Sequence, residues 1–218
     1  MSYMTLPELF EHHKGLPANK FPHHMEIYER LFNPMLDVAQ LGLLEIGLGH
    51  GGSLEIWRKY FGKQACIAGL DIQDLTGIKV DATIFQGDQT DKSLLRRIAS
   101  QCGPLHIIID DGSHRTPDQQ ITFETLFPLL QDGGVYIVED IHTSYRTEFG
   151  GSGKHDPNNI IEFLKDMVDG MHMNEWAGVA DTTHIFGIEF YPSMAVVHKR
   201  NPGAWGGPTV RPAEKHQC

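Results

Sequence analysis

Two pairs of adjacent carboxylates are the most chemically suggestive residues of this 218-residue chain. Asp110 and Asp111 directly follow one short apolar run, and Glu139 and Asp140 directly follow the next. Runs of this kind are typical of buried strands. If the two strands are neighbours, about 4.8 Å apart, all four carboxylates meet at one edge of a sheet. Such a cluster repels itself or shifts its pKa values unless a cation neutralises it.

A hard divalent cation suits this cluster, because oxygen ligands without a nearby cysteine favour Mg2+. Side chains alternate along a strand, so the four carboxylates do not all face the same way. One aspartate is then free to turn toward the amino group of a cofactor. The alternative is a set of helix caps and turn acids, but pairs at two successive strand ends argue against it.

Two histidines lie close to these carboxylates in the sequence. His114 comes three residues after Asp111, where a neutral imidazole beside a metal-bound hydroxyl is a natural general base. His142 is the second candidate, either as a base or as a packing and hydrogen-bonding residue.

A glycine-rich loop follows the first apolar run, and Gly47, Gly49 and Gly52 satisfy the pattern GxGxxG. Glycine lets the backbone approach a ligand closely, and the start of the following helix favours a negative group. The pattern is shared by several nucleotide-containing cofactors, so it leaves a nicotinamide dinucleotide open.

Polar residues around this loop favour S-adenosylmethionine instead. Glu45 lies inside the first strand, and Asp71 ends the second, where it can accept hydrogen bonds from ribose hydroxyls. Asp88 and Gln89 end the third strand, where a carboxylate can meet an adenine or its amine. S-adenosylmethionine carries a ribose, an adenine and a cationic sulfonium but no phosphate. The alternative for Glu45 is a buried acid with a purely structural role.

Seven apolar runs are expected to form the strands that position these groups. They cover residues 41–46, 66–70, 82–85, 105–109, 135–138, 183–190 and 194–199. Helical patterns separate the first five runs, which predicts an α/β fold with a doubly wound parallel sheet. The last two runs are expected to form a hairpin. Ligands of such sheets bind at the carboxyl ends of the strands, where the polar residues lie.

Two helix starts are expected from capping residues. Asp91 can cap a helix with Leu94 on its inner face. Thr116 is expected as the next N-cap, with Pro117 at the first helical position and Gln119 completing a capping box.

Composition narrows the class of protein further. The chain has 18 Lys and Arg against 28 Asp and Glu, a formal charge of −10, which disfavours nucleic acid as a partner. No stretch is apolar enough for a membrane span. Cys66, Cys102 and Cys218 are scattered, which fits free thiols in the cytoplasm. A homo-oligomer is expected.

Several segments are similar to the metal-dependent sugar O-methyltransferases of macrolide biosynthesis, of the mycinamicin and macrocin type. This family belongs to the class I S-adenosylmethionine-dependent methyltransferase superfamily. The segments are LEIGLGHGGSLEIWRKYF, GLDI, QGDQTD, IIIDDGSH and FPLLQDGGVYIVEDIHTSY, with the helix that follows. The resemblance covers residues 41–171, and its most specific parts are DDGSH and EDxHTSY.

The resemblance implies methyl transfer from S-adenosylmethionine to a sugar hydroxyl of a glycosylated natural product, with Mg2+ required. It implies a seven-stranded Rossmann-like sheet, mostly parallel with a C-terminal antiparallel strand, in a single domain at residues 41–200. Residues 1–40 would be a lead-in or lid, and residues 201–218 a Gly/Pro-rich tail. Carried over, Asp111, Glu139 and Asp140 would bind the metal and His114 would be the base. The cofactor residues would be Gly47, Gly49, Ser53, Asp71, Asp88 and Asp110.

The chain departs from the family pattern at its N-terminal end. Some relatives carry an extra N-terminal domain, for which this chain is too short. The lead-in of the family is only loosely matched, which leaves Lys20, His24 and Tyr28 as candidate substrate or lid residues.

Three alternatives stay open. The literal GxGxxG allows an NAD-dependent sugar oxidoreductase, which has no use for the carboxylate pairs. A second alternative is a non-catalytic metal- or nucleotide-binding module. A third keeps methyl transfer but uses a non-sugar hydroxyl acceptor, such as a catechol-like diol.

Overall fold

The computed structural model describes residues 4–151, 153–156, 159–173, 182 and 184–201. Within these ranges, no helix has both the length and the apolar character needed to cross a bilayer. The tail expected at residues 201–218 lies outside the described residues, apart from Asn201.

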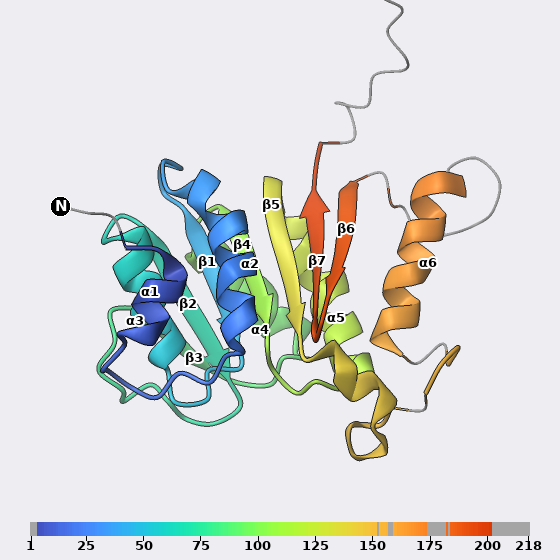
Figure 1. Ribbon diagram of the computed structural model, residues 1–218, viewed down its shortest axis with the longest axis horizontal. Helices are drawn as coiled ribbons and strands as arrows, with labels where there is room; N and C mark the ends of the chain where they lie inside the picture. Colours follow the sequence, from blue (N-terminus) through green and yellow to red (C-terminus); the bar gives the residue numbers. More distant parts are fainter. Residues whose placement is uncertain (1–3, 152, 157–158, 174–181, 183, 202–218) are drawn as a thin grey trace, which may run out of the picture.

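The centre of the molecule is a seven-stranded sheet with the order β3-β2-β1-β4-β5-β7-β6 (Figure 1). Only β7 runs antiparallel to its neighbours β5 and β6, so the predicted doubly wound sheet with a C-terminal antiparallel strand is confirmed. The strands are β1 (Gly42–Ile46), β2 (Cys66–Asp71), β3 (Thr83–Gln86), β4 (Leu105–Asp110), β5 (Leu130–Glu139), β6 (Ile185–Tyr191) and β7 (Met194–Lys199).

Helices cover both faces of the sheet, with α2 in front of it and α5 behind it in Figure 1. One face packs in a core with α1 (Leu6–Glu11), α2 (Pro22–Phe32) and α3 (Gly52–Phe61). The other packs with α4 (Lys92–Gln101), α5 (Thr116–Leu126) and α6 (Ile160–Met173). Short 3-10 helices are η1 (Asn33–Met35), η2 (Phe127–Leu129), η3 (Ile141–Tyr145) and η4 (Thr147–Phe149).

The lead-in expected at residues 1–40 contains α1 and α2, which share the core of the sheet. Tyr28 and Phe32 of α2 are fully buried. Their rings pack against Trp57 of α3, with centroids 5.2 Å and 5.7 Å away. The N-terminal helices are therefore tied to the helix that follows the glycine loop.

Strand β5 begins earlier than the sequence predicts, at Leu130 instead of residue 135. Asp132-Gly133-Gly134, expected to lie before the strand, falls within it. Gly133 has a φ of +80°, and the register with β4 shifts between Leu105 and Ile107. Gly133, in the left-handed conformation, thus lies in a β-bulge, and the strand begins before the apolar run that predicts it.

One predicted helix start is confirmed and the other is wrong. The Asp91 carboxylate accepts hydrogen bonds from the backbone N–H groups of Ser93 and Leu94, at 2.9 Å and 3.0 Å. Thr116, however, is the first helical residue of α5, and its Oγ1 accepts a hydrogen bond from Ile160 of α6 at 3.0 Å. The expected capping box is absent because this tertiary contact uses the Thr116 hydroxyl.

Candidate active site at the carboxyl ends of the strands

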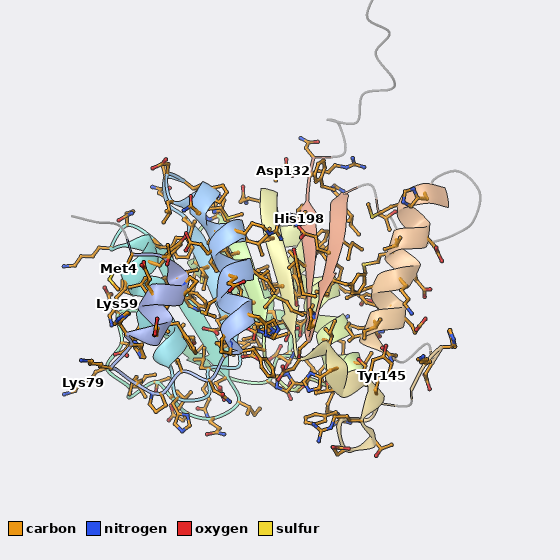
Figure 2. The ribbon with its side chains drawn as sticks, in the orientation of Figure 1. Met4, Lys59, Lys79, Asp132, Tyr145 and His198 are labelled. Carbon is orange, nitrogen blue, oxygen red and sulfur yellow. The ribbon has the colours of Figure 1, made fainter. Side chains whose placement is uncertain are left out.

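The carboxyl ends of the central strands border a cavity of about 560 Å3. In Figure 2, the label of Tyr145, which follows β5, lies near this end of the strand, and the label of Asp132 lies near the opposite end. Of the predicted site residues, Asp110, Glu139 and His142 do not line this cavity. The predicted residues that do line it are Glu45, Gly47, Gly49, Ser53, Asp71, Asp88, Gln89, Asp111, His114 and Asp140.

The glycine loop passes close to the loop after β4. Gly47 has a φ of +81°, and a Cβ there would lie 2.0 Å from the carbonyl oxygen of Asp111. Gly49 has a φ of +54°, and a Cβ there would meet nothing within 4 Å. Gly47 is therefore required by the protein itself, whereas the open space at Gly49 leaves its backbone accessible to a ligand.

Glu45 is fully buried at the cavity wall. Its Oε2 accepts hydrogen bonds from Ser53 Oγ at 2.7 Å and from Trp57 Nε1 at 2.9 Å. Its Oε1 forms an ion pair with Lys20 Nζ at 2.9 Å. The side chain that the sequence placed inside the first strand is thus held at both oxygens.

The ends of β2 and β3 present acidic side chains held by backbone groups. Asp71 accepts hydrogen bonds from the N–H groups of Leu48 and Gln73, both at 2.8 Å, which fixes the glycine loop beside β2. Asp88 accepts from the N–H and hydroxyl of Thr90 at 2.7 Å and 2.8 Å. These bonds hold the pKa of Asp88 below its ordinary value.

Asp110 lies behind the cavity wall and is fully buried. Tyr136 donates its hydroxyl to Oδ2 at 3.0 Å, and Gln89 donates Nε2 to Oδ1 at 3.2 Å. Burial raises the pKa of this carboxyl to about 6, although both hydrogen bonds oppose the shift. Asp110 therefore supports Gln89, which lines the cavity, and the cofactor contact predicted for Asp110 stays a prediction.

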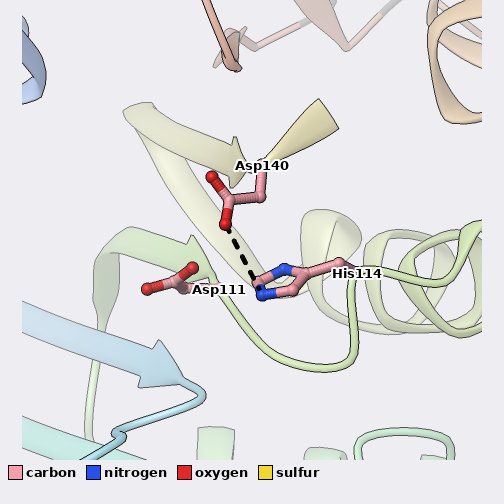
Figure 3. Close-up of side chains that lie close together, drawn as sticks. All are labelled: Asp111, His114 and Asp140. Atoms are coloured by element: carbon pink, nitrogen blue, oxygen red, sulfur yellow. Dashed lines mark ion pairs between the residues drawn. The ribbon is translucent and has the colours of Figure 1, made fainter. Parts of the chain in front are cut away.

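Asp111, His114 and Asp140 converge at the predicted carboxylate cluster (Figure 3). Each offers one potential metal-ligand atom, and these atoms all lie within 4.8 Å of one another. His114 Nε2 lies 3.7 Å from Asp140 Oδ2. His114 and Asp140 both adopt the left-handed conformation, with φ of 57° and 54°. Backbone strain of this kind persists where the surrounding structure fixes it, and it clusters at functional sites.

The imidazole of His114 is largely shielded from solvent, with 21% of its side chain exposed. Its buried Nδ1 has no hydrogen-bond partner among the described residues. Burial lowers the pKa of His114, against the opposing charges of Asp140 and Glu139. The ring is therefore biased toward the neutral form, which can accept a proton.

Glu139 lies in a buried network instead of in the group of Asp111, His114 and Asp140. Tyr28 donates its hydroxyl to Oε1, and His24 Nδ1 lies 3.1 Å from Oε2. Burial raises the pKa of Glu139, but Lys20, His24 and Tyr28 outweigh it and hold the pKa at about 2. Glu139 is thus a stable anion, held by the segment that the sequence marked only as a candidate lid.

Lys20 connects that segment to the site. Its Nζ lies 2.6 Å from both Asp111 Oδ2 and Glu139 Oε1. Burial favours the neutral amine, but Glu139, Glu45 and Asp111 raise the pKa of Lys20 well above its ordinary value. The side chain is therefore a buried ammonium between carboxylates.

Ser193 is a site residue that could not be selected from the sequence. It lies in the turn between β6 and β7, and its Oγ donates to Asp140 Oδ1 at 3.1 Å. His142 Nδ1 lies 2.6 Å from the same hydroxyl and 3.9 Å from Asp140 Oδ1, so His142 contacts both residues. The Pro-Ser pair between two strands signals a turn, but nothing local indicates which loop that turn contacts.

Comparisons with known proteins agree with this geometry. The chain is 37% identical over 195 residues to the 8-demethyl-8-alpha-L-rhamnosyl tetracenomycin-C 2'-O-methyltransferase of Streptomyces olivaceus, covering 83% of this chain and 51% of that enzyme. It is 34% identical over 206 residues to the mycinamicin VI 2''-O-methyltransferase of Micromonospora griseorubida, covering 86% and 50%. The chain thus spans about half the length of the curated relatives it matches. No protein-family model matches it.

The chain is also similar to solved structures of a methyltransferase. The MycE methyltransferase of the mycinamycin biosynthetic pathway, in complex with Mg, SAH and mycinamycin VI, superposes with a TM-score of 0.81 at 31% identity. The match covers 97% of this chain and 57% of that one. A second MycE structure, with Mg and SAH, also gives a TM-score of 0.81, and covers 98% and 59%. Over most of its own length, the chain is therefore similar to part of these macrolide-type sugar O-methyltransferases.

Proposed function

We propose that this protein is a Mg2+-dependent O-methyltransferase that moves the methyl group of S-adenosylmethionine to a sugar hydroxyl. The acceptor is a sugar on a glycosylated natural product, such as a macrolide or another polyketide. The observation that carries the proposal is the convergence of Asp111, His114 and Asp140 beside a glycine-bordered cavity. The relatives that modify rhamnosyl tetracenomycin and mycinamicin support the choice of a sugar acceptor.

Open backbone and polar side chains in the cavity support binding of this cofactor. The open space at Gly49 lets a ligand approach the backbone. Each oxygen of Asp71 accepts one backbone hydrogen bond and keeps a second lone pair for a ribose hydroxyl. Asp88 is exposed in the same cavity and can accept from an adenine. Glu45, Gly47, Ser53 and Gln89 complete the wall on this side.

The carboxylates fit the metal through their donor atoms. Asp111 and Asp140 offer oxygens within one small group, and oxygen is the ligand that Mg2+ prefers. Glu139 is the third ligand that we assign, and its Oε1 lies 2.6 Å from the same ammonium as Asp111 Oδ2. Bound Mg2+ would lower the pKa of an acceptor hydroxyl and neutralise the charge that develops on it.

The residues of this chain then orient the reactants and remove a proton. His114 Nε2 faces the group of ligand atoms, and the lowered pKa of the ring keeps it ready to accept the hydroxyl proton. Ser193 fixes Asp140 from behind, and the glycine loop fixes the cofactor. Most of the rate gain would come from this alignment of nucleophile and methyl group.

The test is calorimetric titration of S-adenosylhomocysteine and of NAD, each with Mg2+ or with EDTA, followed by methyl-transfer assays. We expect micromolar binding of S-adenosylhomocysteine, no binding of NAD, and metal-dependent methylation of a glycosylated polyketide. The Asp111→Asn variant should lose the metal dependence. Binding of NAD alone would make the protein an oxidoreductase candidate, and binding of neither would favour a non-catalytic module.

An assay with different acceptors distinguishes a sugar acceptor from a non-sugar hydroxyl acceptor. A glycosylated polyketide, its aglycone and a catechol-like diol should be compared under the same conditions. Transfer to the diol or to the aglycone alone would contradict the sugar assignment while leaving the reaction class intact. A homo-oligomer and a cytoplasmic location stay predictions from the sequence.

A further inference from the structure

Lys20 places its ammonium group among three buried or partly buried carboxylates of the site. Its side chain is 3% exposed, and its Nζ lies 2.6 Å from Asp111 Oδ2, 2.6 Å from Glu139 Oε1 and 2.9 Å from Glu45 Oε1. The residue belongs to the connection between α1 and α2, which runs along the carboxyl ends of the strands at the lower edge of Figure 1. One ammonium thus contacts carboxylates from β1, β5 and the loop after β4.

Two of these oxygens belong to residues that we assign to the metal. Magnesium binds oxygens at about 2.0–2.1 Å and demands near-octahedral geometry. An ammonium on the same two oxygens would stand within a few ångströms of the divalent ion, where the repulsion between the charges is strong. The ammonium and the metal ion would therefore contact the same oxygens of Asp111 and Glu139.

We propose that Lys20 is a tethered cation that competes with the divalent metal for Asp111 and Glu139. In the metal-free protein, Lys20 compensates the buried carboxylates. When the metal binds, the ammonium gives up both oxygens. This inference rests on the Mg2+ dependence proposed above and describes how this chain prepares the site for the ion.

The backbone on either side of Lys20 is held in place by its own contacts. Leu16 donates its N–H to Glu55 Oε2 at 2.8 Å, and Pro17 accepts a hydrogen bond from the N–H of Gly52 at 3.3 Å. These bonds anchor the chain before Lys20, and α2 begins just after it at Pro22. Glu45 keeps its own bonds to Ser53 and Trp57, so its Oε1 remains a fixed counter-ion for the displaced ammonium.

The first measurement is the affinity for Mg2+, by calorimetry on the full chain without cofactor. The Lys20→Met variant removes the charge but keeps an unbranched side chain, and we expect its Mg2+ affinity to rise about tenfold. Lys20→Arg keeps a cation and should not show this gain. Lys199→Met is the matched control, because Lys199 is also buried but donates to the carbonyl oxygens of Phe127 and Pro128.

The second measurement needs no loss of Lys20 and so avoids a variant that fails to fold. The side-chain ammonium signal of Lys20 can be followed by NMR in the wild-type protein, with Lys20→Arg used to assign it. We expect this signal to shift during Mg2+ titration, in step with the calorimetric binding curve. The signal of Lys199 should stay unchanged.

The outcomes separate this inference from the proposed function. Unchanged or weaker Mg2+ affinity in folded Lys20→Met would overturn the competition, as would a Lys20 signal that ignores bound Mg2+. In either case the metal dependence itself would stand. If wild-type protein did not bind Mg2+ at all, both the metal dependence and the competition would be wrong.

Discussion

His114 is the residue whose replacement should most affect turnover. A positioned general base contributes about 10²- to 10⁴-fold, so we expect His114→Ala to lower kcat by that factor. The Kd for S-adenosylhomocysteine should stay close to the wild-type value, because the ring lies beside Asp140 and we assign it no contact with the cofactor. Steady-state kinetics and calorimetry measure the two quantities. His142→Ala is the control, with a smaller loss expected; near-normal turnover of His114→Ala would remove this residue from its role.

Asp110 gives a prediction for the pH dependence of stability. Burial raises its pKa to about 6 from an ordinary value of 3.8. A group with a raised native pKa contributes stability that is fully present below about pH 3.8 and is lost as the pH rises through 6. At 1.36 kcal/mol per unit, the loss is about 3 kcal/mol.

Urea unfolding of the wild type and of Asp110→Asn, both in EDTA, tests this sign. Because the asparagine does not titrate, the difference in unfolding free energy isolates Asp110. We expect the wild type to lose about 2.5 kcal/mol of this stability relative to the variant between about pH 4 and pH 7. A difference that stays constant over this range would contradict the prediction.

The sequence predicted those site residues whose positions follow from strand ends. Glu45, Asp71, Asp111 and Asp140 could be found because a parallel sheet brings the carboxyl ends of its strands together. The detailed partners could not be found. Lys20 and Glu139 are 119 residues apart, and no local pattern specifies such a contact.

At the scale of elements, the turn of the β6–β7 hairpin lies beside the carboxyl end of β5, where Ser193 donates a hydrogen bond to Asp140. Residues that orient a metal ligand typically change affinity about 10- to 100-fold when removed. We expect Ser193→Gly to weaken Mg2+ binding by this factor, measured by calorimetry. Ser193 has a φ of 65°, which glycine adopts freely, so the free energy of unfolding should not fall.

The control for this variant is His155→Gly. His155 also has a left-handed backbone, with a φ of 64°, and does not line the cavity. It should keep wild-type affinity for Mg2+. Equal affinities for Ser193→Gly and the wild type would show that the hairpin does not position Asp140.

Most strands could be predicted because apolar runs mark them directly. The predicted range of β7 is confirmed. Strands β2 and β4 each extend one residue beyond their own predicted ranges, to Asp71 and Asp110. The exceptions have tertiary causes. Leu130 pairs with Leu105 of β4 ahead of the bulge, which lengthens β5. Thr116 accepts a hydrogen bond from α6 instead of capping its own helix.

At the scale of the whole molecule, the N-terminal helices share a core with the sheet. Phe32 is fully buried and packs against Tyr28, Trp57 and Phe61. We expect Phe32→Ala to lower the free energy of unfolding by about 3–5 kcal/mol. Phe186→Ala is the control, because this side chain is 67% exposed and should cost no more than about 0.5 kcal/mol.

Urea unfolding followed by both circular dichroism and tryptophan fluorescence measures this change. If α1 and α2 belong to the same cooperative unit as the sheet, both probes report one transition. Transitions that do not coincide between the two probes would mean that the N-terminal helices unfold separately.

The hydrogen bond between Ser193 and Asp140 also has a consequence for synthesis on the ribosome. The two residues are 53 positions apart, and β7 lies between β5 and β6 although it is made last. At about 5 to 20 residues per second, roughly 3 to 10 s pass between the addition of Asp140 and that of Ser193. The residues of the glycine loop and the carboxylates Asp111 and Asp140 are therefore synthesised before Ser193, which holds Asp140. The order of translation is thus also the order in which the site is assembled.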